Sequence, residues 1–101
     1  MKIIYTRKAK ADLNELREFL QPQSPSGLQN VVGDILGLTE ALPTSIARGR
    51  MTDHPDVLEK LTPKYNYLIP YTVYQGDLYI LRVYHPSRKK LDYTKIVDLR
   101  E

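Results

Sequence analysis

The sequence of 101 residues contains no cysteine, no tryptophan and only two histidines, His54 and His85. The lack of cysteine excludes disulfides, thiolate metal sites and cysteine nucleophiles, and it is consistent with a reducing compartment. Two histidines cannot form a multi-histidine zinc site, and we expect neither a metal nor another cofactor. No apolar run approaches the roughly 20 residues of a membrane helix. Because charged residues are mixed through Met1–Phe19, this segment is not typical of a signal peptide, and we expect a cytoplasmic protein.

Several motifs that would indicate an enzyme are also missing. The sequence has no glycine-rich phosphate-binding loop and no serine nucleophile elbow. Asp53, His54 and Asp56 surround a proline, where they are more typical of a turn than of a metal site. The length supports one domain, residues 1–101. A net charge of +3 permits an anionic partner but does not require one.

The first part of the chain predicts a short strand and two amphipathic helices. Met1–Tyr5 is apolar and β-prone, and Thr6 is a candidate N-cap for a helix that begins at Arg7. The apolar residues that recur at helical spacing in this helix are Ala9, Leu13, Leu16 and Leu20. Because only a short proline-containing loop separates this helix from the next one, we expect an antiparallel helical hairpin.

The second helix has a clear predicted start and end. Ser26 and Gln29 form a capping box that places its start at Ser26, and Pro43 ends it. Gly33 and Gly37 lie inside the helix, where a glycine costs about 1 kcal/mol relative to alanine. Close packing against the first helix would explain both glycines.

The remainder of the chain is rich in tyrosine and predicts a series of strands. Val57–Leu61 is flanked by prolines, which favours an edge strand. Two β-prone runs, Tyr65–Tyr74 and Leu78–His85, enclose turn residues and predict a hairpin. A last short strand or arm is expected at Thr94–Leu99.

This order of elements predicts an α+β fold, with an N-terminal strand and an antiparallel helical hairpin packed on a twisted antiparallel β-sheet. Helices that precede a run of strands are typical of this class. The expected core between hairpin and sheet consists of Leu13, Leu16, Val32, Ile35, Ile69, Tyr71, Leu81 and Val83.

Basic residues gather at the end of the last long strand, where four fixed cations and no acid lie between Arg82 and Lys90. Cleavage of a phosphodiester through the ribose 2′-hydroxyl requires one group that accepts a proton, one that donates a proton and a guanidinium that stabilises the phosphorane. The imidazole of His85, the phenol of Tyr84 and the arginines of this cluster are groups of these types. A solvated basic loop and a structural histidine are the alternative interpretations. We predict one basic surface that includes Arg50, Arg82, His85 and Arg88.

The order of these segments resembles the RelE/ParE superfamily of bacterial toxins from toxin–antitoxin modules. The matching segments are Tyr5-Thr6, Asp12-Leu13, Leu42-Pro43, Gly49-Arg50, Tyr67–Val73 and Ile80–Arg88, the last of which ends in an H-x-x-R pattern. The resemblance implies a helical hairpin on a twisted antiparallel sheet and a cognate antitoxin encoded by an adjacent gene. It also implies one of two activities, ribosome-dependent mRNA cleavage or poisoning of DNA gyrase.

Departures from the RelE pattern favour a ParE-like toxin. Leu58 and Pro70 occupy positions where the superfamily often has arginine, which reduces the basic surface of the sheet. We therefore predict a growth-inhibiting type II toxin that targets DNA gyrase and is neutralised by its antitoxin. A RelE-like ribosome-dependent mRNA endoribonuclease and an inactive antitoxin-binding module are the alternatives.

The resemblance also implies roles for individual residues. If the protein is a ribonuclease, the candidate catalytic residues are His85, Arg88 and Tyr93. The candidates for binding nucleic acid or the target are Arg50, Arg82, Lys89 and Lys90. An apolar groove at the helical hairpin and the sheet edge is expected to accept an extended or helical acidic segment of the antitoxin.

Overall fold

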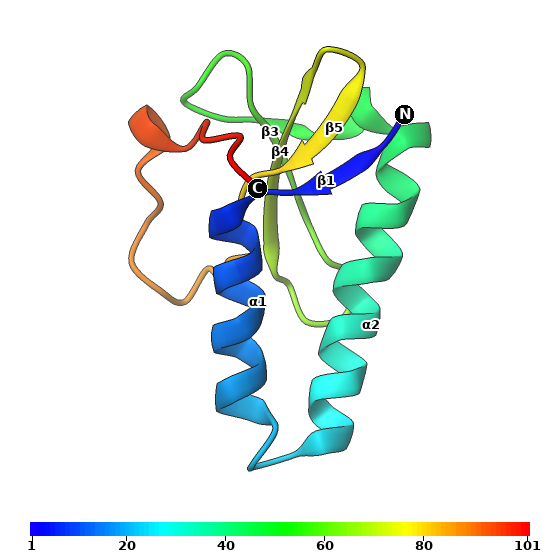
Figure 1. Cartoon of the computed structure of the whole chain (residues 1–101), viewed down its shortest axis with the longest axis vertical. Coiled ribbons are helices and arrows are strands. Elements are labelled where there is room, and N and C mark those ends of the chain that lie inside the picture. The colour runs from blue at the N-terminus through cyan, green and yellow to red at the C-terminus, as the bar shows by residue number, and fades with distance from the viewer.

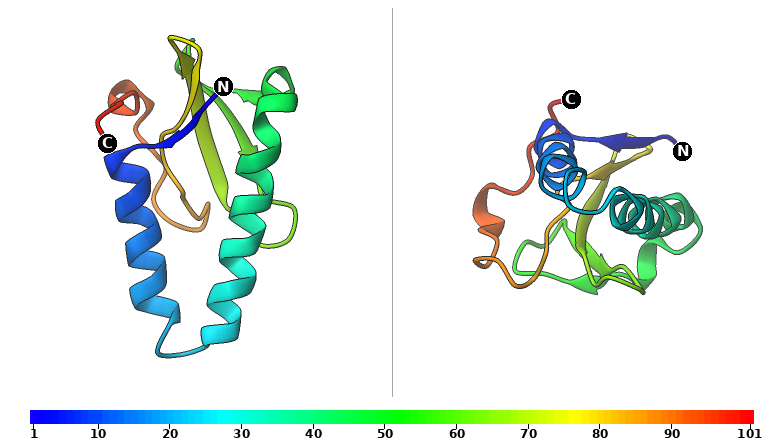
Figure 2. Two further views of the ribbon diagram at one scale, coloured as in Figure 1. Left: turned by 45° about the vertical axis from the view of Figure 1, so that its right-hand side comes forward. Right: turned by 90° about the horizontal axis from the view of Figure 1, so that it is seen from below.

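A helical hairpin and a five-stranded sheet make up the computed structural model, which describes residues 1–101 (Figure 1). In chain order the elements are β1 (Ile3–Tyr5), α1 (Arg7–Leu20), α2 (Pro25–Ala41), β2 (Arg50–Met51), β3 (Leu58–Leu61), β4 (Leu68–Tyr74) and β5 (Asp77–Ile80). Both helices cover the same face of the sheet (Figure 2). The predicted α+β fold is confirmed, although β1 joins β5 in parallel and makes the sheet mixed. None of the helices has the length and apolar character needed to cross a membrane.

The strand order is β1-β5-β4-β3-β2, so β1 and β2 form the two edges. Flanking prolines predict that β3 is an edge strand, but β2 pairs with the first two residues of β3. The β4–β5 hairpin has the predicted turn, in which Gln75 and Gly76 have positive φ values of 50° and 80°. These two positive φ values are typical of a type I′ turn, whose twist matches that of the flanking strands.

Side-chain caps fix the start of both helices. The Thr6 hydroxyl accepts an N–H of the first turn of α1, as predicted. The second helix begins at Pro25 rather than at the predicted Ser26, because the Ser24 hydroxyl accepts the Gly27 N–H at 3.0 Å. Proline fits the first position of a helix, where its missing N–H would have had no helical partner.

The glycines inside α2 do not contact α1. Gly33 and Gly37 are exposed, and a Cβ added at either position would have no neighbouring atom within 4 Å. The prediction that they pack against the first helix is therefore wrong. A requirement for glycine exists instead at Gly49, where an added Cβ would collide with the Tyr71 side chain. Tyr71 is held there because its hydroxyl donates to the Ile46 carbonyl at 2.6 Å.

The main core lies between the helical hairpin and the sheet. It consists of Ala9, Leu16, Leu28, Val31, Ile35, Leu42, Ile69, Tyr71, Leu78, Ile80 and Val83. Leu13 and Val32 pack against this core in partly buried positions. The prediction for Leu81 is wrong in its location, because Leu81 is buried on the opposite face of the sheet. The second cluster on that face consists of Val57, Leu81, Leu91 and Ile96.

A β-bulge explains why Leu81 and Val83 face opposite sides of the sheet. The register of β4 and β5 would pair Leu68 with Val83, but Leu68 is bridged to Tyr84. One extra residue is therefore inserted, which shifts the alternation of the side chains. As a result, β5 ends well before the predicted limit at His85.

The C-terminal segment covers the second face without forming the strand that was one expectation for Thr94–Leu99. It contains a 3₁₀ turn at Tyr93–Lys95, and its side chains Leu91, Ile96 and Leu99 pack in the second cluster. The chain then returns to the start of α1, where the Arg7 N–H donates to the Arg100 carbonyl at 2.6 Å (Figure 1). Apolar contacts rather than sheet hydrogen bonds hold this segment in place.

Replacing Leu81 with alanine should lower the free energy of unfolding by about 2–5 kcal/mol, because it leaves a cavity in the second cluster. Urea denaturation measures this loss. Leu61→Ala is the matched control, since Leu61 is 41% exposed and its truncation should cost less than about 1 kcal/mol. Equal losses in the two variants would contradict a second buried cluster around Leu81.

Asp34 of α2 holds the loop between β3 and β4 in place through hydrogen bonds to its backbone. The buried carboxylate accepts the N–H groups of Lys64 at 3.2 Å and Tyr65 at 2.8 Å. Burial opposes ionisation, but hydrogen bonds from the Thr62 hydroxyl and from these N–H groups outweigh it and lower the pKa of Asp34. The ionised form of Asp34 therefore stabilises the fold.

Asp34→Asn should lower the free energy of unfolding by about 1–3 kcal/mol at neutral pH. Since the folded-state pKa lies below the unfolded one, the stabilisation is complete above the unfolded pKa and is lost as the pH falls through the folded pKa. Urea denaturation of both proteins across this range measures the effect. A difference between wild type and variant that persists unchanged in strong acid would contradict the role of the charge.

Candidate functional site

His85 lies on the side of the sheet that carries α1. Its ring packs edge-on against Tyr67, with 5.1 Å between the ring centroids. Its Nδ1 atom accepts the Ser87 N–H at 3.2 Å and lies 2.6 Å from the Ser87 hydroxyl. The bulge after Leu81 causes this placement, because an uninterrupted strand would have turned His85 to the opposite face.

Arg82 is held by the carboxylate of Asp12 in α1. Its Nε and Nη2 atoms lie 2.7 and 2.9 Å from the two carboxylate oxygens. The Val83 N–H donates to the same carboxylate at 2.9 Å. Hydrogen bonding to Asp12 raises the pKa of Arg82, although burial opposes its charge. The guanidinium charge of Arg82 is therefore neutralised within the fold.

The remaining cations of the basic segment are exposed. Arg88 lies 3.3 Å from Glu15, and Lys90 lies 3.9 Å from Asp53. Lys89 forms no ion pair. Exposed ion pairs contribute little free energy, so these three side chains are free to rearrange toward a partner.

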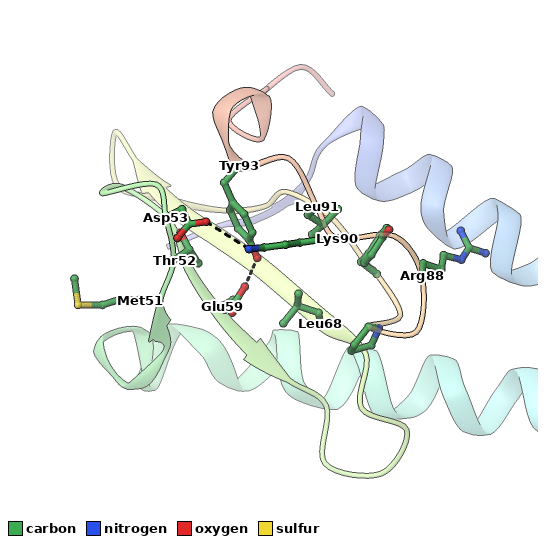
Figure 3. Close-up of a pocket in the computed structure, with 11 residues that line it drawn as sticks. Met51, Thr52, Asp53, Glu59, Leu68, Arg88, Lys90, Leu91 and Tyr93 are labelled. Carbon is green, nitrogen blue, oxygen red and sulfur yellow. Dashed lines mark hydrogen bonds and ion pairs between the residues drawn. The ribbon is translucent and has the colours of Figure 1, made fainter.

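Arg50, Glu59 and Tyr93 form a cluster on the opposite face of the sheet. Arg50 Nη2 lies 2.8 Å from Glu59 Oε1, and the Tyr93 hydroxyl donates to Glu59 Oε2 (Figure 3). Burial, together with the hydrogen bond and charge of Glu59, raises the pKa of Tyr93. The phenol therefore stays protonated at neutral pH, where it donates a hydrogen bond and cannot serve as a general base.

A cavity of about 460 Å³ opens beside this cluster, between the sheet and the C-terminal segment (Figure 3). Its charged lining consists of Asp53, Glu59, Arg88 and Lys90. Two carboxylates balance two cations, so the cavity is not a basic surface. No group of three or more histidine, aspartate and glutamate side chains is arranged to hold a metal ion.

The structure separates the residues that were expected to share one basic surface. His85 and Arg82 face α1, whereas Arg50 and Tyr93 lie on the opposite face. Arg88 lies between the two sides and lines a cavity on each. Neighbours in the sequence are therefore divided between two environments.

Two acidic residues that organise the site were missed by sequence reasoning. Glu59 lies two positions from both Val57 and Leu61, and a strand places the side chains of all three residues on the same face. Asp12 lies four positions before the buried Leu16, at the border of the apolar face of α1. A carboxylate in such a mostly buried position needs a cation or several N–H donors, and this requirement was the available signal.

Comparisons with known proteins agree with this architecture. Residues 3–90 match the family described as "ParE toxin of type II toxin-antitoxin system, parDE". The fold is similar to a chain of the solved "Chromosomal ParDE TA system from P. aeruginosa", with 25% sequence identity and a TM-score of 0.73. That similarity covers 84% of this chain and 95% of the other. No curated protein matches the chain.

The helical hairpin on a five-stranded sheet, together with these similarities, defines a toxin of the RelE/ParE superfamily. Within this superfamily, the chain belongs to the ParE toxin family of type II toxin–antitoxin systems. Membership of a toxin–antitoxin family implies a cognate antitoxin as partner.

Asp12→Ala should lower the free energy of unfolding by about 2–4 kcal/mol, because it leaves a half-buried guanidinium and a backbone N–H without their acceptor. Glu15→Ala is the matched control on the same helix. It breaks only an exposed pair and should change stability by no more than about 0.5 kcal/mol. If chemical denaturation gives the same loss for both variants, the role assigned to Asp12 is wrong.

Proposed function

We propose that this ParE-family toxin stops growth by binding DNA gyrase in the cytoplasm and that its antitoxin is the product of an adjacent gene. The family match and the similarity to a ParDE system support this function. A RelE-like ribonuclease and an inactive antitoxin-binding module are the competing functions. The experiment below separates all three.

The separation of His85 from Tyr93 is the observation that most favours binding over RNA cleavage. Acid–base cleavage needs a proton donor and a proton acceptor within hydrogen-bond reach of one phosphodiester. His85 lies beside α1, while Tyr93 is held by Glu59 on the opposite face. The guanidinium of Arg82, which would stabilise a phosphorane, is already bound to Asp12.

We assign the gyrase contact to the exposed loop that follows the bulge. Arg88 and Lys90 are exposed in this loop and have only exposed acidic partners, and Lys89 has no partner. These side chains can reach a target without a large loss of stability. Arg50 and Arg82, in contrast, serve the fold through their carboxylate partners.

We assign the antitoxin contact to the helical hairpin. Leu13 and Val32 are only partly buried, and Leu36 is 39% exposed. Lys10 and Arg17, three positions before and four after Leu13, are exposed and form no ion pair. An apolar strip with cations beside it suits an amphipathic helix that carries acidic residues.

The purified toxin should inhibit supercoiling by gyrase and leave translated mRNA intact. His85→Gln should keep this inhibition, because binding does not use the imidazole as an acid or base. A ribonuclease that uses His85 would instead lose about 10²–10⁴-fold of its activity. Gel assays of DNA supercoiling and of mRNA cleavage during translation measure the two activities.

The double variant Lys89→Glu/Lys90→Glu should weaken gyrase inhibition at least about tenfold through charge repulsion. Lys95→Glu is the control, because Lys95 is exposed in a different segment. Cleavage of mRNA by the wild type would establish the ribonuclease. A folded wild type that has neither activity but binds its antitoxin would establish the inactive module.

A further inference from the structure

A small cleft of about 280 Å³ lies between α1 and the chain that leaves the bulge. Its lining includes Asp12, Leu16, Phe19, Tyr67, His85 and Arg88. Leu16 is buried, and Phe19 is 64% exposed. The cleft therefore combines apolar surface with several polar groups.

The polar groups of this cleft that still lack hydrogen-bond partners are donors. The Tyr67 hydroxyl forms no hydrogen bond within the chain. Burial raises the pKa of Tyr67, although the charge of Arg88 opposes this shift, so the hydroxyl stays protonated. His85 accepts the Ser87 N–H through Nδ1, which leaves Nε2 to carry the proton of the neutral ring. Arg88 has a single exposed contact, with Glu15, so most of its N–H groups are free.

The carboxylate that lines the cleft offers no competing acceptor. Asp12 already accepts two N–H groups of Arg82 and one of Val83. A ligand that enters the cleft therefore meets free donors and a buried apolar side chain. The complementary chemistry is a carboxylate carried next to an apolar group.

We propose that this cleft binds an aspartate or glutamate side chain of the cognate antitoxin, with a neighbouring apolar residue of the antitoxin packed on Phe19. The small volume of the cleft, about 280 Å³, suits the insertion of a side chain. The cleft also shares α1 with the proposed hairpin contact, so one antitoxin segment can cover both. The proposal rests on membership of a toxin–antitoxin family and is independent of gyrase as the target.

The first experiment uses two blocked tripeptides as probes, Leu-Glu-Leu and Leu-Gln-Leu, added to the full-length toxin. The glutamate peptide should shift the NMR signals of the Tyr67 and His85 rings in a saturable way. The glutamine peptide should bind about tenfold more weakly, because it lacks the charge-assisted hydrogen bonds. Equal binding of the two peptides, or no shift with either, overturns the proposal.

The second experiment measures the dissociation constant of the toxin for the purified product of the adjacent antitoxin gene. Tyr67→Phe and Arg88→Gln should each weaken binding about tenfold, as expected for the loss of one charge-assisted hydrogen bond. Lys95→Gln is the matched control, since it removes an exposed charge outside the cleft and outside the proposed gyrase contact, and it should bind as the wild type does. Circular dichroism verifies that all variants are folded.

The possible outcomes distinguish this proposal from the proposed function. If Tyr67→Phe binds the antitoxin normally, the cleft is not an antitoxin site and the proposal fails. If Tyr67→Phe loses gyrase inhibition while its antitoxin affinity is unchanged, the occupant is the target, which also overturns it. If the wild type does not inhibit gyrase but the cleft variants lose antitoxin affinity, the proposed target is wrong and the cleft proposal is supported.

Discussion

The Asp12 carboxylate at the bulge is the interaction on which the geometry of the site depends. It accepts N–H groups from the Arg82 side chain and from Val83, at the point where the pairing of β5 with β4 is interrupted. A bulge leaves backbone groups without ladder partners, and a half-buried guanidinium without a carboxylate would be costly. One side chain of α1 satisfies both requirements and joins the helix to the end of the strand.

The bulge determines which chemistry is available on each side of the sheet. Val83 and His85 turn toward the helices, while Tyr84 packs with the second cluster on the opposite face. The C-terminal segment then places Tyr93 against Glu59, away from His85. A basic sequence that looks like one catalytic surface is therefore divided into a cleft beside α1 and a charge-balanced cavity over the sheet. This division favours recognition of partners over acid–base chemistry at a single phosphodiester.

Local signals in the sequence were sufficient for the first helix and for the turn of the β4–β5 hairpin. The cap at Thr6 and the turn at Gln75-Gly76 depend on residues close in sequence, so α1 and the β4–β5 hairpin were predictable. The bulge was not predicted, because Leu78–His85 is a continuous β-prone run and the extra residue is stabilised by Asp12, some seventy positions away. For the same reason Leu81 was assigned to the wrong face. The exposed Gly33 and Gly37 have no intramolecular contact that explains them.

The distribution of acidic partners separates the cations that maintain the fold from those that can meet another molecule. Arg50 and Arg82 each face a mostly buried carboxylate, and breaking either pair would leave a charge without compensation. Arg88 pairs only at the surface, where water already screens the interaction. Its guanidinium can therefore exchange Glu15 for the carboxylate of a partner at little cost. Tyr67 and His85 line the same cleft as Arg88, so an acidic side chain that enters it meets donors which the solvated ion pair with Glu15 does not provide.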